Sequence, residues 1–164
     1  MEYAAVYSSP VGMLTLTAKD AGLTGLYLRP PTDRERSLPE RCRHLEEAKD
    51  WLDRYFAGRN PDPRELALLP EGSPFRRLIW ELLLKIPTGE VRTYGALAKE
   101  AAARLGKEKM SAQAVGGAVG SNPISIIIPC HRCVAAGGKL GGFGWGPEAK
   151  KWLLGHEGGS YDHQ

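Results

Sequence analysis

Apolar and polar residues alternate along Met13–Ala18, the period-two pattern of a β-strand with one buried face. The next residues, Lys19–Gly22, have the composition of a turn, and Leu23–Leu28 then runs back as a partner strand. The pair Pro30–Pro31 ends the pattern, because proline cannot donate to a sheet. Residues 3–28 therefore predict a small β-sheet.

Residues 38–57 carry the three- and four-residue spacing of an amphipathic helix, and Gly58 follows as its stop. The apolar stripe consists of Leu38, Cys42, Leu45, Ala48, Leu52, Tyr55 and Phe56. The spacing predicts one helix across the sheet, with Cys42 in the core. Sheet and helix together form the expected N-terminal unit.

Residues 60–72 are rich in proline and lack a clear period, which is typical of a linker. Ser73 and Pro74 then provide an N-cap and a first helical residue. We therefore expect two domains. Residues 1–70 form an N-terminal support domain with its linker, and residues 71–164 form a C-terminal domain.

Helix caps recur through the second domain. Thr93 precedes a helix over residues 94–105, Ser111 caps a short helix that ends at Gly120, and Pro147 opens a last helix. Two short helices in succession resemble a helix-turn-helix, although ordinary helix pairs are more common. The expected fold class is α+β, with a mostly helical second domain.

Composition narrows the class of protein. The chain has 164 residues, of which 42% are hydrophobic and 25% charged, a globular balance. No apolar run approaches the roughly 18 residues of a membrane span, and the N-terminus does not resemble a signal peptide. Three cysteines are too few for a secreted disulfide framework. We expect a cytoplasmic protein without membrane contact.

The charge is unevenly distributed. Residues 1–60 carry nine acidic and nine basic side chains, whereas residues 74–151 carry twelve basic and five acidic ones. A basic half beside a neutral half favours contact with a polyanion such as nucleic acid. A basic surface that only aids solubility is an equal alternative at this point.

The densest chemistry follows a buried, strand-like run, Ile126–Ile128, which leads to Cys130, His131 and Arg132. A thiol needs a base or a cation nearby to become a nucleophilic thiolate. A carboxylate that orients the imidazole completes such a relay, and Glu157 is a distant candidate. The alternative is a structural cysteine beside an incidental histidine.

Cys130 and Cys133 also form a C-x-x-C motif, which suggests a redox pair or half of a zinc site. The redox motif requires a helix after its first cysteine, but Val134–Gly144 contains five glycines and no helical period. A zinc site needs two further ligands, and Cys42 and His44 are the weak candidates. Both readings remain minor alternatives.

Several motifs together resemble the O6-alkylguanine-DNA alkyltransferases, also called methylated-DNA–protein-cysteine methyltransferases. The resemblance extends from Ser73 to Gly158, while residues 1–70 agree only in general plan. The motifs are Gly89–Tyr94, Ala114–Val119, Asn122–Pro123, Pro129–Arg132 and Trp152–Gly158.

The resemblance implies the catalytic roles. Cys130 accepts an alkyl group from O6 of a guanine flipped out of duplex DNA, and His131 deprotonates this thiol through a water. Glu157 orients His131, and Asn122 holds the turn before the active site. Tyr94 lies by the rotated phosphate and helps to protonate N3 of the leaving guanine.

The same resemblance implies a guanine pocket. The backbone carbonyls of Cys130 and Cys133 receive the guanine amino group, and the N–H of Gly144 faces O6. Phe143 stands where relatives often have tyrosine, so a hydroxyl is lost. Trp145 stands where many relatives have glycine and narrows the alkyl pocket, unless it packs on the last helix instead.

The resemblance also places the helix over residues 111–120 in the minor groove, where small side chains allow close approach. The residues expected at DNA are Tyr94, Ser111, Ala112, Gln113, Ala114, Gly117 and Arg132. Gln113 departs from the family, whose members usually have an arginine that fills the gap left by the flipped base. The stretch between Tyr94 and Gln113 is also longer than usual.

A thioether product has no good leaving group, so one molecule repairs one lesion. We expect a monomer that needs no cofactor and no metal and that acts on double-stranded DNA containing O6-alkylguanine. The rivals are a non-enzymatic binder of alkylated DNA and a thiol redox protein. His44, His156 and His163 are expected to be surface or structural residues.

Overall fold

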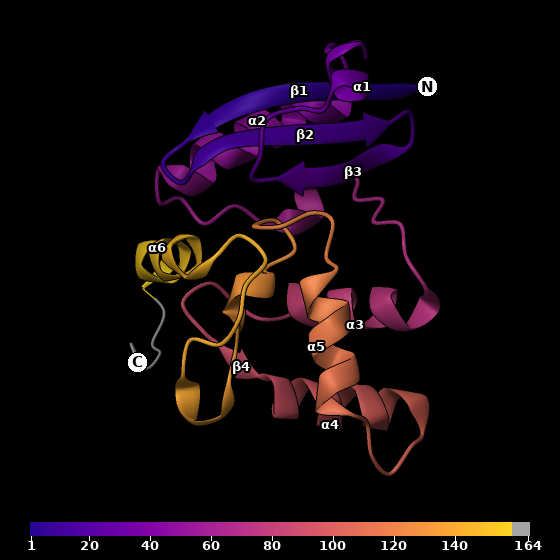
Figure 1. The fold of residues 1–164 in the computed structure, drawn as a ribbon, viewed down its shortest axis with the longest axis vertical. Helices are drawn as coiled ribbons and strands as arrows, with labels where there is room; N and C mark the ends of the chain where they lie inside the picture. The colour runs from indigo at the N-terminus through magenta and orange to yellow at the C-terminus, as the bar shows by residue number, and fades with distance from the viewer. Residues whose placement is uncertain (159–164) are drawn as a thin grey trace. The chain divides into compact units, whose positions relative to one another are not determined.

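A computed structural model describes residues 1–158, and the chain divides into two compact units (Figure 1). The sheet unit comprises Met1–Glu71 together with Pro123–Ser125. The helical unit comprises Gly72–Asn122 and the chain from Ile126 onward. The α+β class expected from the sequence is confirmed.

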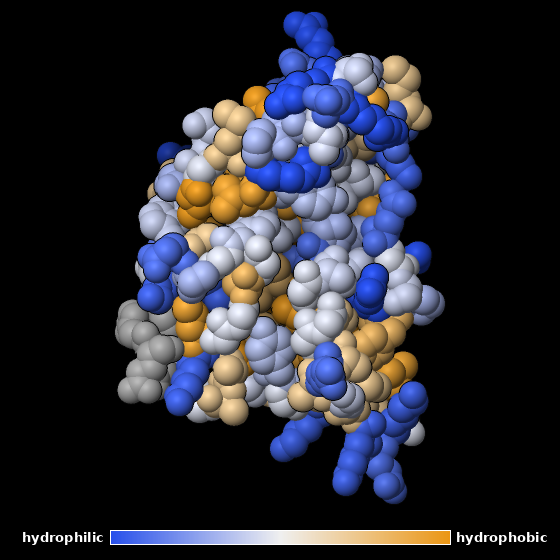
Figure 2. Space-filling model, viewed as in Figure 1, coloured by the Kyte–Doolittle hydropathy of each residue, from blue (hydrophilic) through white to orange (hydrophobic). Residues whose placement is uncertain are grey.

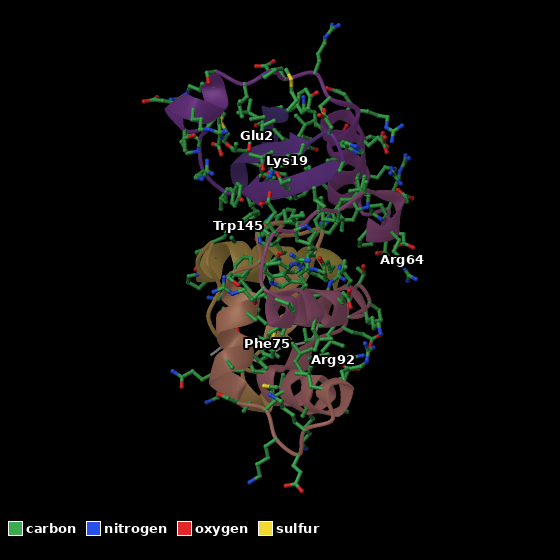
Figure 3. All side chains as sticks on the ribbon, turned by 90° about the vertical axis from the view of Figure 1, so that its right-hand side faces the viewer. Glu2, Lys19, Arg64, Phe75, Arg92 and Trp145 are labelled. Carbon is green, nitrogen blue, oxygen red and sulfur yellow. The ribbon has the colours of Figure 1, made fainter. Side chains whose placement is uncertain are left out.

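Three antiparallel strands build the sheet in the order β1 (Glu2–Ser9), β2 (Gly12–Lys19) and β3 (Gly22–Tyr27). Alternation in β2 buries Leu14 and Leu16, which are 0% exposed. The strands predicted at Met13–Ala18 and after residue 22 are confirmed. In Figure 3, Glu2 and Lys19 mark one end of the β1–β2 ladder, where they are paired.

Helix α2 (Arg43–Phe56) packs on the sheet through an apolar face that includes Leu45, Ala48 and Leu52. It begins five residues later than predicted, because Pro39 interrupts the spacing and proline disrupts a helix interior. Cys42 consequently lies at the N-cap and is only half-buried. The expected core position of Cys42 is therefore wrong.

Sequence analysis missed a one-turn helix, α1 (Asp33–Arg36), before α2. Thr32 and Glu35 form a capping box around it, a spacing that the sequence does contain. The stretch interpreted as a linker also has structure. It includes a 3₁₀ helix, Pro63–Glu65, and its Ala67 and Leu69 exchange backbone hydrogen bonds with β3.

The helical unit begins with α3 (Pro74–Leu84), α4 (Tyr94–Leu105) and α5 (Ala112–Gly120), which pack against one another (Figure 1). Their predicted N-caps are all confirmed. The hydroxyls of Ser73, Thr93 and Ser111 each accept a backbone hydrogen bond in the first turn of their helix.

Trp80 joins α3 to α5, because its buried indole N–H donates to the carbonyl of Ala118 at 2.8 Å. Two short parallel strands, β4 (Arg92–Thr93) and β5 (Cys133–Val134), bring the start of α4 beside the cysteine segment. Short 3₁₀ helices and a last helix complete the unit: Cys130–Arg132, Ala136–Gly138 and α6 (Pro147–Glu157).

Candidate active site

A buried turn delivers Cys130, and the strand predicted at Ile126–Ile128 is wrong. Ile126 has a φ of +70°, which is incompatible with an extended strand, and residues 125–127 form a turn. The three isoleucines are nevertheless buried, as expected. The side-chain amide of Asn122 donates to the carbonyl of Ile128 at 2.8 Å and ties the two ends of this segment together.

Cys130 opens the 3₁₀ helix and is 5% exposed. Its backbone carbonyl accepts a hydrogen bond from the N–H of Cys133, a residue that is 0% exposed. Burial raises the pKa of the Cys133 thiol to about 12, although the Lys150 ammonium opposes this rise. Cys133 is therefore protonated at neutral pH, which makes it a poor nucleophile.

The residues after Cys130 meet one carboxylate. Nε2 of His131 lies 2.6 Å from Oε2 of Glu157, and Nε of Arg132 donates to Oε1 at 2.7 Å. Burial alone would raise the pKa of Glu157, but His131 and Arg132 outweigh it and lower that pKa to about 2. Glu157 is consequently an anion at neutral pH, with both oxygens engaged.

His131 is neutral in this setting. Its side chain is 0% exposed, and burial lowers its pKa below the ordinary value despite the attraction of Glu157. A neutral imidazole donates from only one nitrogen, and the Glu157 carboxylate requires Nε2 to be that donor. Nδ1 therefore carries a lone pair, and among residues 1–158 it has no hydrogen-bond partner. The arrangement leaves a buried proton acceptor on the residue next to Cys130.

Arg132 is directed into the protein. Besides Glu157, its guanidinium donates to the carbonyl of Ile86 at 2.7 Å and to the hydroxyl of Thr88 at 3.1 Å. Its side chain is 8% exposed. The guanidinium is buried and bound within the protein, so its position does not favour the predicted contact of Arg132 with DNA.

Lys150 is a site residue that sequence analysis counted only as part of the basic half. It is 0% exposed, and its ammonium donates to the carbonyls of Cys133 at 2.7 Å and Gly142 at 3.0 Å. Burial lowers its pKa. The signal was available, because Lys150 shares a helical face with the apolar Leu153 and Leu154.

The glycine-rich loop lies against the relay. The hydroxyl of Tyr94 is 3.5 Å from the carbonyl of Gly142, and burial raises the pKa of Tyr94 to about 12. The half-buried ring of Phe143 stands edge-on to His131 with centroids 6.5 Å apart. The ring of Trp145 lies 5.9 Å from that of Phe143, just before α6 (Figure 3).

Gly144 stands between these two rings and is exposed. The carbonyl of Cys133 already accepts a hydrogen bond from Lys150. A carbonyl oxygen has a second lone pair, so this contact does not prevent another donor from binding there.

Helix α5 presents small residues to the outside. Its exposed positions are Ala112, Gln113, Ala114, Gly117 and Gly120, and the cap Ser111 is exposed as well. Val115, Ala118 and Val119 face inward. Hydrophilic side chains cover the connection from α4 (Figure 2), which contains Lys107, Glu108 and Lys109.

The remaining candidates lie elsewhere. Cys42 is in the sheet unit, and Nε2 of His44 is 3.0 Å from the carbonyl of Asp20. His156 stacks on Trp152 at 4.8 Å, while His163 lies outside the described residues. Within residues 1–158 there is no cluster of three acidic, histidine or cysteine side chains that could hold a metal, and no helix able to cross a membrane.

A buried cysteine next to a histidine–carboxylate pair, in a unit with three capped helices, is typical of a protein whose thiol acts as a nucleophile. Two family descriptions match the chain: "6-O-methylguanine DNA methyltransferase, ribonuclease-like domain" over residues 3–70, and the DNA binding domain of the same name over residues 74–159. The chain belongs to the 6-O-methylguanine DNA methyltransferase family.

Similarity in sequence and structure to known methyltransferases supports this assignment. A methylated-DNA–protein-cysteine methyltransferase of Methanosarcina acetivorans is 38% identical over 159 residues, which cover 95% of this chain and 98% of the relative. Its counterpart in Mycolicibacterium paratuberculosis is 40% identical over 156 residues, covering 94% and 90%. The Mycobacterium tuberculosis protein in complex with DNA has a TM-score of 0.80 and 38% identity, covering 95% of this chain and 92% of that one.

Proposed function

We propose that this chain repairs DNA by transferring the alkyl group from O6 of an alkylated guanine to Sγ of Cys130, once per molecule. The observation that carries the proposal is the relay of Cys130, His131 and Glu157. Its imidazole is neutral, buried and oriented, with Nδ1 available for the thiol proton.

The chemistry follows from these protonation states. Nδ1 of His131 takes the proton of Cys130, directly or through one water, and Glu157 stabilises the imidazolium that forms. The Cys130 thiolate then attacks the alkyl carbon while the bond from that carbon to O6 breaks. The electron pair leaves with guanine, and a proton on N3 neutralises the base.

Tyr94 is our candidate for that last proton. Its raised pKa of about 12 keeps the phenol protonated at neutral pH, so it can donate a hydrogen bond. The thioether formed on Cys130 offers water no good leaving group. The transfer is therefore irreversible and stoichiometric.

The target base must leave the duplex, because an atom inside the stack cannot meet a buried thiol; flipping costs a few kcal/mol. We assign the exposed face of α5 to the minor groove, where Ala112, Ala114 and Gly117 permit close approach and Gln113 occupies the vacated position. Phe143, Gly144 and Trp145 form the pocket wall. We assign Arg132 to the positioning of Glu157 and not to DNA.

In this proposal residues 71–164 bind DNA and transfer the alkyl group, and residues 1–70 support them. The protein acts as a cytoplasmic monomer on O6-alkylguanine in double-stranded DNA. Asn122 holds the turn that leads to Cys130, and its hydrogen bond to Ile128 supports this role.

The test is incubation with a duplex oligonucleotide that contains one O6-methylguanine, followed by intact mass measurement and tryptic mapping. We expect one methyl group per molecule on the peptide Met110–Arg132, whose only cysteine is Cys130. The same duplex with ordinary guanine is the control. Methyl groups on Cys42 or Cys133, or no transfer at all, would reject the proposal.

A further inference from the structure

Alkyl transfer uses the Cys130 thiol of the C-x-x-C motif and gives the Cys133 thiol no role, yet the structure gives the whole motif a defined shape. Cys130–Arg132 form a 3₁₀ helix, and the N–H of Cys133 donates to the carbonyl of Cys130. The lack of helical spacing in Val134–Gly144 left a redox pair as a minor alternative. The turn that brings the two cysteines together instead begins at Cys130 itself.

The geometry of this turn suits a disulfide. A turn closed by a hydrogen bond between its first and fourth residues keeps their Cα atoms within about 7 Å. Disulfides span Cα separations of about 4.4 to 6.8 Å. Cys130 opens the 3₁₀ helix, and Cys133 is the C-cap residue that ends it and begins β5. Neither cysteine forms a disulfide in the structure.

We propose that Cys130 and Cys133 form a reversible oxidation site, at which a hydroperoxide converts the two thiols to a disulfide and so blocks alkyl transfer. This inference rests on the proposed function, because it assigns a second reaction to the same acceptor sulfur. It adds a ligand class, small hydroperoxides, that alkyl transfer does not use.

The reaction is balanced in two steps. The Cys130 thiolate attacks one peroxide oxygen, the O–O bond breaks, and Cys130 becomes a sulfenic acid while hydroxide leaves and takes up the thiol proton as water. The sulfur of Cys133 then attacks Sγ of Cys130. The S–S bond forms, and the sulfenic oxygen departs as water with the Cys133 proton.

Burial orders these two steps. Cys130 is 5% exposed and directly precedes His131, whose Nδ1 has no hydrogen-bond partner among residues 1–158, so Cys130 meets the peroxide first. Cys133 is 0% exposed and keeps its proton at neutral pH, so it serves as the resolving thiol. Lys150 lies close by, with its ammonium on the Cys133 carbonyl, and favours negative charge on this sulfur.

The consequence is protection of a thiol that the protein can use only once. Sulfinic and sulfonic acids at Cys130 would be irreversible, whereas a disulfide is restored by a dithiol reductant. Oxidised protein should be inert towards alkylated DNA until it is reduced.

The test uses the full-length protein, hydrogen peroxide in stoichiometric amount, and trypsin without reductant. Trypsin cuts after Arg132, so Cys130 and Cys133 fall on separate peptides, Met110–Arg132 and Cys133–Lys139. We expect an intact mass lower by two hydrogen atoms, these two peptides linked, and both effects reversed by dithiothreitol. Linkage of either peptide to Cys42, or oxygen adducts on Cys130 without any linkage, would overturn the proposal.

Two matched variants separate the site from general oxidation. Cys42→Ser should form the link unchanged. Cys133→Val, which replaces a buried thiol by an apolar group, should gain oxygen atoms on Cys130 and recover at least about tenfold less methyl transfer after reduction. Recovery equal to that of the parent protein would count against Cys133; if Cys133→Val does not fold, Cys133→Ser supplies the same comparison.

Failure of the proposed function is distinguishable from failure of this inference. The mass shift and the linked peptides need no DNA, so they are measured even if reduced protein transfers no methyl group. Protein methylated on Cys130 beforehand should form no link, because a thioether has no thiol to oxidise. A link in fully methylated protein would overturn the inference.

Discussion

The two units of the molecule differ in where they bury basic side chains: among the described residues, the buried ones, His131, Arg132 and Lys150, lie in the helical unit. In the sheet unit, ion pairs such as Arg54–Glu65 lie at the surface, with side chains 31% and 44% exposed. In the helical unit, Arg132 and Glu157 pair with side chains 8% and 1% exposed. Exposed pairs contribute little to the free energy of unfolding. Breaking a buried pair lowers that free energy strongly, because the remaining charge stays buried without a partner.

This difference shows that the helical unit gives up some stability in order to carry the reactive groups. A core of aliphatic residues would stabilise the helical unit without risk, yet it contains a buried histidine, carboxylate, guanidinium and ammonium. Each has partners that fix its protonation state. The sheet unit resembles an ordinary small domain, and matched substitutions in the two units should behave differently.

The largest difference between the two units is expected in the rate of methyl transfer after replacement of a cysteine. Cys130→Ser should lower the rate of methyl transfer by about a thousandfold or more, because a neutral hydroxyl is far less nucleophilic than a thiolate. Affinity for the DNA duplex should persist. Second-order rate constants with an O6-methylguanine oligonucleotide measure the effect.

Cys42→Ser in the sheet unit is the matched control and should leave the rate unchanged. Cys133→Ser should also retain transfer, since the Cys133 thiol is protonated at neutral pH. A Cys130→Ser protein that still accepts methyl groups would remove Cys130 from its assigned role.

Substitutions of His131 and Glu157 should have the next largest effect on the rate of methyl transfer. His131→Gln and Glu157→Gln should each slow methyl transfer by about a hundredfold to ten-thousandfold, the usual range for general acid–base groups. The double variant should be little slower than the worse single one, because the two residues act as a unit. Single-turnover rates and DNA affinity should be measured together.

His44→Gln tests the same chemical change in the sheet unit, where Nε2 of the ring lies 3.0 Å from the turn carbonyl of Asp20. That variant should react at the parent rate. Strictly additive losses for His131 and Glu157 would contradict a coupled relay.

The buried ion pair should contribute to the loss of stability in acid, as should Glu35 of the sheet unit, whose pKa is lowered to about 2 by its hydrogen bond from Arg29. Glu157 has a pKa of about 2 in the folded protein against an ordinary 4.5, so its contribution is present above pH 4.5 and is lost as pH falls towards 2. This difference corresponds to about 3 kcal/mol in the free energy of unfolding. Arg132→Met should therefore destabilise by about 3–5 kcal/mol at pH 7, by urea unfolding.

Arg54→Met removes a guanidinium from the exposed pair and should change the free energy of unfolding much less. The gap between the two variants should narrow at pH 3, where the parent protein loses part of the Glu157 contribution. A gap independent of pH would show that Arg132 acts by packing alone.

The sequence could predict some features of the two units but not others. Local rules were sufficient for the helix starts at Ser73, Thr93 and Ser111, because a cap depends only on residues within one turn. The Cys130–His131 pair was found because its members are adjacent. Glu157 was only a distant candidate, and the contact between them is a property of the fold.

Predictions from the sequence were wrong where contacts between distant segments determine the local structure. The left-handed backbone of Ile126 turned a strand-like apolar run into a turn. Arg132 was predicted to contact DNA and Lys150 was counted only in the basic half, since composition does not show that distant carbonyls and a carboxylate surround them. Both errors concern buried polar contacts, the feature that distinguishes the helical unit.

A smaller effect is expected at Trp145, which contacts Phe143 in the glycine-rich loop. If the indole narrows the alkyl pocket, O6-benzylguanine should react poorly while O6-methylguanine reacts well. Overpacking costs about 1–3 kcal/mol, which is roughly tenfold or more in rate. Trp145→Gly should restore the benzyl reaction selectively, as measured by rate constants for both substrates.

Trp51→Phe in the core of the sheet unit should change the free energy of unfolding without changing the ratio of the rate constants for the benzyl and methyl substrates. Equal gains on both substrates for Trp145→Gly would place the indole outside the pocket wall. Ready reaction of the parent protein with the benzyl substrate would do the same.

The smallest expected effect concerns α5, where Gln113 is exposed near the helix start. Gln113→Arg should tighten DNA binding severalfold at low salt, because a guanidinium is attracted into the negative potential of the minor groove. One added phosphate contact also steepens the dependence of log affinity on log salt by about 0.9. Glu47→Gln on α2 changes the net charge equally but in the sheet unit, so its affinity and salt slope should match the parent. Equal tightening by both variants would indicate a net-charge effect, and Gln113 would then have no special place in the groove.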